Sequence, residues 1–190
     1  DTPSFPAGSI RINEVMADPK GQKAFPETEY VELYNTTDKA IELNGWSFLY
    51  GSKPTVLTAL LLDADGYVVL YRSGRDIHID DAGLDLPLDK FPASLVNTGK
   101  ELALFDPSGK EIDRIAYEKA KVGIAWERSE TGFHLSTDER GGTPGSANSS
   151  PDDEPEDPDR PDTPHKPGIP TDIIVLPNEI VFNELLPNPY

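Results

Sequence analysis

Residues 29–48 read EYVELYNTTDKAIELNGWSF, and this stretch decides the fold. Near its start, Val31 and Leu33 alternate with residues of more polar or amphipathic character. Alternation with a period of two places successive side chains on opposite faces of a strand. We therefore expect a half-buried strand over residues 29–35, with Glu32 on the opposite face from Val31 and Leu33.

Similar short apolar runs, bounded by Gly, Pro, Asn or Asp, recur through the first part of the chain. The expected strands cover residues 10–16, 29–35, 45–50, 55–61, 66–71, 101–105 and 111–117. Turn residues indicate hairpins at Asp63–Gly66 and Asp106–Gly109, where glycine supplies a positive φ. We expect residues 76–96 to form a long loop or a short helix. Short strands separated by turns are typical of an all-β fold, here an immunoglobulin-like antiparallel β-sandwich.

The composition changes after Asn148. Prolines recur at every third residue from Pro155 to Pro170, with many acidic residues between them. Polyproline II has three residues per turn, and like charges extend a chain further. We predict that residues 1–148 form the sandwich and that residues 149–175 form an extended, acidic, proline-rich linker that spaces domains stiffly.

The last residues, IVFNELLPNPY (180–190), repeat the pattern of IRINEVMADPK (10–20), with Ile, Asn, Glu and Pro at matching positions. Self-similarity of this kind indicates repeated units. We predict that residues 176–190 are the first strand of a second, truncated repeat. Chance recurrence of a short apolar strand is the alternative.

This terminal strand is apolar and lacks a sheet of its own within the chain. An unpaired strand can add to an exposed sheet edge of another molecule. We therefore predict self-association by strand donation, carried by Val181, Phe182, Leu185 and Leu186.

The overall charge excludes one class of partner. Among 190 residues, 34 are acidic and 17 are basic, which gives a formal net charge of -17. Such a chain repels nucleic acid phosphates, so we expect no nucleic acid partner. The chain has no cysteine, which excludes disulfides and thiolate chemistry. No run approaches the roughly 20 apolar residues of a spanning helix, so we expect no direct membrane insertion.

Four stretches together resemble the lamin tail domain family: INEVMADPKG, EYVELYNTTDKAIELNGWSF, GKELALFDPSGKEIDRIAY and GGTPGSAN. The resemblance spans residues 9–148 and implies an immunoglobulin-like β-sandwich without a catalytic apparatus. In bacteria, domains similar to these occur typically in exported or cell-envelope proteins, alone, in tandem or fused to hydrolases such as nucleases and phosphatases. The ending VFNELLPNP also resembles the first strand of such a domain. The acidic charge departs from the basic surface suited to a chromatin-facing role.

The most suggestive polar residues are Asn13, Glu14, Glu29 and Glu32. Pairing of their two strands would bring Glu14 near Glu32, and paired carboxylates suit acid–base chemistry or cation binding. The alternative is structural: Asn13 and Glu14 bond backbone groups at a strand bend, and Glu32 lies on the solvated face. We favour the structural interpretation and predict no catalytic residue.

Metal binding has one candidate segment, in which His78, Asp80 and Asp81 would supply an imidazole and carboxylates. We expect no cofactor, and calcium is the ion that such carboxylates would favour. Asp63–Gly66 resembles the start of a calcium loop, but Gly74 stands where that loop needs a glutamate, so a turn explains it better.

Both tryptophans are expected in the core, Trp46 on a strand where such sandwiches bury one. The alternative for Trp126, beside Arg128 and Phe133, is an exposed ring that stacks on sugars.

Two functions follow as hypotheses. The first is a non-enzymatic structural or interaction module of an exported or cell-envelope multidomain bacterial protein, with a protein or an envelope component as its partner. The second is an accessory domain of a secreted hydrolase, which binds a glycan, a calcium ion or an envelope component.

Overall fold

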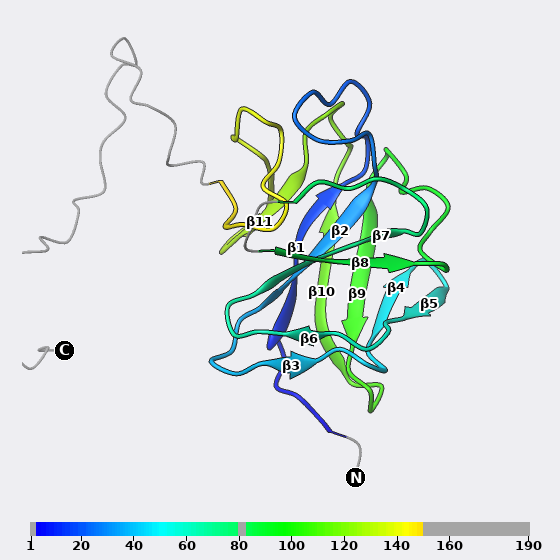
Figure 1. The fold of residues 1–190 in the computed structure, drawn as a ribbon, viewed down its shortest axis with the longest axis vertical. Coiled ribbons are helices and arrows are strands. Elements are labelled where there is room, and N and C mark those ends of the chain that lie inside the picture. Colours follow the sequence, from blue (N-terminus) through cyan, green and yellow to red (C-terminus); the bar gives the residue numbers. More distant parts are fainter. Residues whose placement is uncertain (1–2, 80–82, 150–190) are drawn as a thin grey trace, which may run out of the picture. The chain divides into compact units, whose positions relative to one another are not determined.

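The computed structural model describes residues 3–79 and 83–149, which form strands, turns and loops without a helix (Figure 1). The predicted linker (149–175) and terminal strand (176–190) lie outside these residues, apart from Ser149. The described strands are β1 (Ile10–Met16), β2 (Tyr30–Asn35), β3 (Ile41–Glu42), β4 (Ser47–Tyr50), β5 (Lys53–Val56), β6 (Leu61–Leu62), β7 (Tyr67–Arg72), β8 (Gly83–Leu88), β9 (Lys100–Phe105), β10 (Glu111–Tyr117), β11 (Trp126–Ser129) and β12 (Gly132–Leu135).

Two larger sheets form the sandwich. The first has the order β12-β11-β1-β2-β7-β8, and the second has the order β10-β9-β4-β5. A short ribbon of β3 and β6 completes the fold. Strand β1 packs across the sandwich against β9 and β10 (Figure 1). The chain therefore has the predicted all-β fold, an immunoglobulin-like antiparallel β-sandwich.

The predicted strand over residues 55–61 is wrong. The structure places β5 at 53–56 and β6 at 61–62, in different sheets. Leu57 lies between them and is buried, and its N–H donates to the carbonyl of Trp46 at 2.8 Å. The chain leaves the second sheet at Leu57, so one apolar run serves two sheets.

One of the two predicted hairpins is also wrong. Asp63–Gly66 does form a turn, closed by the Gly66 N–H to the Asp63 carbonyl at 3.1 Å. It joins β6 to β7, however, and these strands pair with β3 and β2 instead of with each other. The positive φ (54°) belongs to Asp65, not to Gly66. The Asp106–Gly109 hairpin between β9 and β10 is confirmed, with a φ of 83° at Gly109.

The segment 76–96, predicted as a loop or a short helix, contains strand β8. Its pairing with β7 is parallel and is the one parallel ladder among the described strands. Leu86 and Leu88 alternate on the buried face, while Pro87 is tolerated because β8 is an edge strand.

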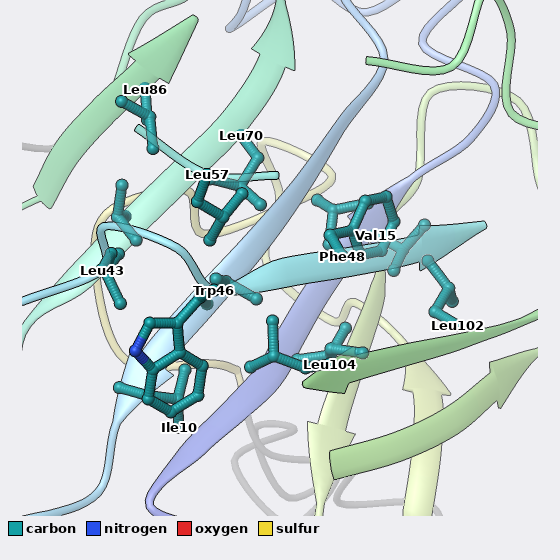
Figure 2. Close-up of a cluster of buried hydrophobic side chains, with 14 of the residues drawn as sticks. Ile10, Val15, Leu43, Trp46, Phe48, Leu57, Leu70, Leu86, Leu102 and Leu104 are labelled. Carbon is teal, nitrogen blue, oxygen red and sulfur yellow. The ribbon is translucent and has the colours of Figure 1, made fainter. Parts of the chain in front are cut away.

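The main core lies between the two large sheets (Figure 2). Trp46 is fully buried there, beside Phe48, and its ring centroid lies 5.0 Å from that of Phe5. Trp46 directly precedes β4 instead of lying within a strand, but its predicted core role is confirmed.

The first sheet is buried on its outer face as well. A second apolar cluster covers that face; it consists of Met16, Tyr30, Val69, Tyr71 and Ala125, with Ile77 and Ile79 packed against it. The prediction that the strand at 29–35 has a solvated face is therefore wrong. Segments that follow β7 and β12 cover the face that period-two alternation assigned to water.

Candidate functional site

A row of acidic side chains crosses the outer face of the first sheet. Glu14 of β1 lies directly opposite Glu32 of β2 on one side and Glu127 of β11 on the other. We call these three residues the carboxylate cluster. Opposed residues in antiparallel strands share a face and lie close together. The predicted approach of Glu14 to Glu32 is thus confirmed, and the structure adds Glu127.

The cluster is fully buried: Glu14, Glu32 and Glu127 each have 0% exposure. The prediction that Glu32 lies on a solvated face is therefore wrong. Residues 141–149, which we call the strap, fold back over the sheet and cover it.

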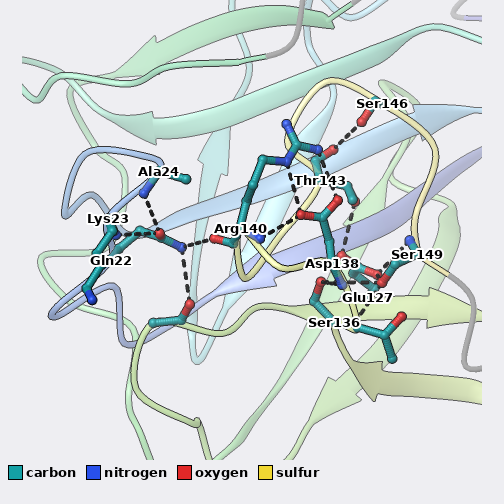
Figure 3. A network of polar contacts seen from close by, with 12 residues as sticks. Gln22, Lys23, Ala24, Glu127, Ser136, Asp138, Arg140, Thr143, Ser146 and Ser149 are labelled. Carbon is teal, nitrogen blue, oxygen red and sulfur yellow. Dashed lines mark hydrogen bonds and ion pairs between the residues drawn. The ribbon is translucent and has the colours of Figure 1, made fainter. Parts of the chain in front are cut away.

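Backbone and hydroxyl groups of the strap satisfy the carboxylates. The Thr143 N–H donates to both oxygens of Glu14 at 3.2 and 3.1 Å, and the Gly145 N–H donates to Oε2 of Glu32. The Ser149 N–H donates to Oε2 of Glu127 at 2.8 Å (Figure 3). Buried polar groups without such partners are costly, so the cluster and the strap stabilise each other.

Thr143 occupies the centre of this arrangement. Its Oγ1 lies 2.9 Å from Oε2 of Glu14 and 3.1 Å from Oε1 of Glu127. A hydroxyl has one hydrogen and can donate it to one oxygen only. The second contact is satisfied when the other carboxyl carries a proton and donates it to Thr143.

Electrostatics favours such a proton. Burial, followed by the negative charge of Glu127, raises the pKa of Glu14 from 4.5 to about 8. Burial and the charge of Glu14 raise the pKa of Glu32 well above its usual value. Tyr30, whose hydroxyl donates to Glu14, also has a raised pKa because it is buried beside carboxylates. Removal from water disfavours the charged forms of all three groups.

Asn13 connects the cluster to the end of the strap. It bulges from β1 where the pairing with β2 shifts, and its Nδ2 donates to Glu32 at 2.7 Å and to Asn148 at 2.9 Å. The Nδ2 of Asn148 returns a bond to the Asn13 carbonyl at 3.1 Å. The predicted strand bend is confirmed, although the Asn13 amide bonds side chains instead of backbone groups.

The strap approaches the sheet closely because residue 142 is glycine. A Cβ there would lie 2.6 Å from Oε1 of Glu14 and 3.0 Å from the Tyr30 hydroxyl. The base of the strap is fixed by Gln22, whose Nε2 donates to the Arg140 carbonyl at 2.7 Å (Figure 3). The cluster is thus enclosed on its open side by the strap backbone.

A separate, open cleft of about 340 Å³ lies between the loops at residues 17–29, 72–75 and 91–97. Glu29 belongs to this cleft and not to the cluster, since it accepts hydrogen bonds from the Leu95 N–H at 2.9 Å and from Ser94 at 3.0 Å. From the sequence, Glu29 is grouped with Asn13, Glu14 and Glu32 as a suggestive polar residue. The structure does not bring Glu29 to the cluster, because it directly precedes β2 and faces the cleft.

Three cations line the cleft: Lys20, Arg72 and Arg75. None of them forms an ion pair with another residue in the described ranges 3–79 and 83–149. Arg72 donates to the Phe91 carbonyl at 3.3 Å and lines the cleft. Three carboxylates, Asp18, Glu27 and Glu29, line the same cleft. The cleft therefore offers both donors and acceptors to a polar ligand, and the cations are the sites for an anionic group on it.

The family model described as Lamin Tail Domain matches residues 3–119. This match covers more than half of the chain. The chain belongs to the lamin tail domain family. Its members are non-enzymatic β-sandwich domains of the structural and protein-interaction type. A comparison with curated proteins found no match.

In this lamin tail domain, the matched region contains Glu14 and Glu32 but ends before Glu127 and the strap. The described residues include no helix with the length and apolarity needed to cross a membrane.

The predicted metal segment is described only in part. His78 stacks on Phe25 with ring centroids 6.3 Å apart, whereas Asp80 and Asp81 lie outside the described residues. Within the described part of the lamin tail domain, no three His, Asp or Glu side chains gather in a way suited to a metal ion. Metal binding by His78, Asp80 and Asp81 stays a prediction.

Trp126 is buried against the main core, as predicted. Arg128 beside it forms an ion pair with Asp113 at 2.7 Å and donates to the Ile12 carbonyl at 2.8 Å. Because the Trp126 ring is buried, it is not exposed for sugar stacking, so that alternative is wrong.

Sequence reasoning missed the roles of Glu127 and Thr143. One signal is present in the sequence, because the stretch GGTPGSAN, which helps to carry the family resemblance, contains Thr143. The pairing of β11 with β1 is not visible in a local pattern, because the two strands are far apart in the chain.

Proposed function

We propose that this lamin tail domain is a non-enzymatic interaction module of an exported or cell-envelope multidomain bacterial protein. Its partner is a protein or an envelope component, and residues 149–175 space the module from its neighbours. The observation that carries the proposal is the strap. The acidic residues most suited to chemistry are turned inward and are bonded to the domain's own backbone.

The position of the strap supports a spacer role for the residues that follow. Ser149 donates both its N–H, at 2.8 Å, and its hydroxyl, at 2.5 Å, to Glu127. The next residues begin the acidic proline-rich sequence, which favours an extended chain. The module thus closes on itself at the start of the proposed spacer.

Strand donation by residues 181–186 is the proposed mode of self-association. We expect the molar mass of the full chain, measured by light scattering, to rise with concentration, whereas a chain that ends at Ser150 keeps its monomer mass. A full-length control, Val181→Asp with Leu185→Asp, keeps the length and the linker but disfavours an apolar strand. It is expected to behave like the shorter chain.

Equal masses for all three chains at every concentration would rule out strand donation. A rise that the double substitution leaves unchanged would assign assembly to another surface.

The cleft favours a second candidate, an accessory domain that binds an anionic glycan for a secreted hydrolase. Lys20, Arg72 and Arg75 would contact carboxylate or sulfate groups. With polygalacturonate as the probe, we expect Arg75→Ala to weaken binding about tenfold in calorimetric titration. Lys53→Ala, which changes an exposed cation on β5, is the control and is expected to change the affinity little. No heat of binding to the unaltered chain would remove this candidate.

A further inference from the structure

We propose that the strap is a proton-dependent latch: protons held within the carboxylate cluster keep residues 141–149 closed over the sheet, and loss of these protons releases them. This inference is independent of the function proposed above, because it concerns how the domain opens and not what it binds.

The geometry supplies the first argument. Glu14 and Glu127 both lie within hydrogen-bond distance of the single Thr143 hydroxyl, at 2.9 and 3.1 Å. With both carboxylates ionised, one of these two oxygens faces the Thr143 oxygen without a hydrogen between them. That contact is repulsive in a buried site, and it is relieved when the strap carries Thr143 away.

The surroundings of the cluster supply the second argument. No described cation forms an ion pair with Glu14, Glu32 or Glu127. The titratable and charged groups that face the cluster from the packed elements are Tyr30 of β2, Tyr67 of β7, His134 of β12, which lies opposite Glu127, and the Asp138–Arg140 pair at the base of the strap. The Arg140 guanidinium is directed to Asp138, with Nε to Oδ1 at 3.0 Å. Neutral donors therefore hold the carboxylates, and proton uptake is the remaining way to reduce their mutual repulsion.

The sign of the pH effect follows from these shifts. Glu14 binds its proton up to about pH 8 with the strap closed, and only up to about its usual value of 4.5 once the strap opens and water reaches it. Between these values the closed form binds more protons, so rising pH favours opening. For each proton that only the closed form retains, the equilibrium constant for opening of the strap rises about tenfold per pH unit. Closure is fully favoured below about pH 4.5, and its stabilisation is lost as pH rises through about 8.

Release has a structural consequence. When the strap is released, its nine residues lengthen the segment that follows the domain by up to about 30 Å. It also exposes the outer face of the first sheet, including Tyr30 and Ala125, which a Cβ at Gly142 would contact.

Hydrogen exchange tests the latch on the intact chain. The Thr143, Gly145 and Ser149 amides donate to the cluster, so their protection factors report strap closure. We expect these factors to fall at least about tenfold per pH unit between pH 5 and 8 and then to level off. Amides of β4 and β9 in the second sheet are expected to stay protected throughout.

Neutral variants separate the latch from general alkaline destabilisation. Glu14→Gln removes one titrating group, so the fall of the strap protection factors is expected to be smaller by about one factor of ten per pH unit. In the double variant Glu14→Gln with Glu32→Gln, these protection factors are expected not to vary with pH. Glu118→Gln, an exposed control on another surface, should leave the slope unchanged. The proposal is wrong if strap protection does not vary between pH 5 and 8, if β4 and β9 lose protection together with the strap, or if the Glu14→Gln slope equals that of the unaltered chain. Should the variants fail to fold, the pH series on the unaltered chain still decides.

Discussion

Replacement of Trp46 with alanine is expected to lower the free energy of unfolding by about 3–5 kcal/mol. The side chain is fully buried in the core between the two sheets (Figure 2). Its ring centroid lies 5.0 Å from that of Phe5. Truncation removes a large apolar surface from the core and leaves a cavity that rigid strands on both sides cannot fill. Urea unfolding, followed by circular dichroism, measures the loss.

Val56→Ala is a suitable control because Val56 is apolar, lies on β5 and is 59% exposed. It is expected to change stability by less than about 0.5 kcal/mol. Equal effects of the two substitutions would mean that Trp46 does not organise the core.

The local pattern was sufficient for much of the fold. Strands β1 and β10 have the predicted bounds, and alternation identified Val31 and Leu33 as core residues. Each of these features depends on neighbouring residues and on the two-residue period of a strand. What failed was the assignment of partners, as at the turn before Gly66, which joins two sheets and was predicted as a hairpin.

The candidate site shows the same difference between features set by neighbouring residues and features set by distant segments. The approach of Glu14 to Glu32 follows from pairing of adjacent strands and was predicted. The burial of Glu32 depends on Gly145, whose N–H reaches it from a segment more than one hundred residues later in the chain. Alternation separates the two faces of a strand but does not say which face another segment will cover. From the sequence alone, a glutamate on the face opposite the core residues of a strand is therefore predicted to be exposed to solvent.

Substitution of Gly142 by a residue with a larger side chain is expected to lower the free energy of unfolding more than any other substitution in the strap. In Gly142→Val, the new Cβ would lie 2.6 Å from Oε1 of Glu14 and 3.3 Å from Cβ of Ala125, and neither neighbour can move freely in a buried sheet. The strap is then forced off the cluster, and the donors from Thr143 and Gly145 are lost. We expect a loss of about 2–4 kcal/mol in the free energy of unfolding. We also expect protection of the strap amides to be low already at pH 5.

Ala147→Val adds bulk at an exposed position of the same strap, so it controls for a larger side chain without the close contact. It should leave both stability and protection nearly unchanged. The steric origin can be tested with a double-mutant cycle, because Glu14→Ala removes the carboxylate that Gly142→Val would meet. On that background the cost of Gly142→Val should shrink by at least about 1 kcal/mol. An undiminished cost would show that Tyr30 and Ala125, and not the buried carboxylate of Glu14, limit the space at residue 142.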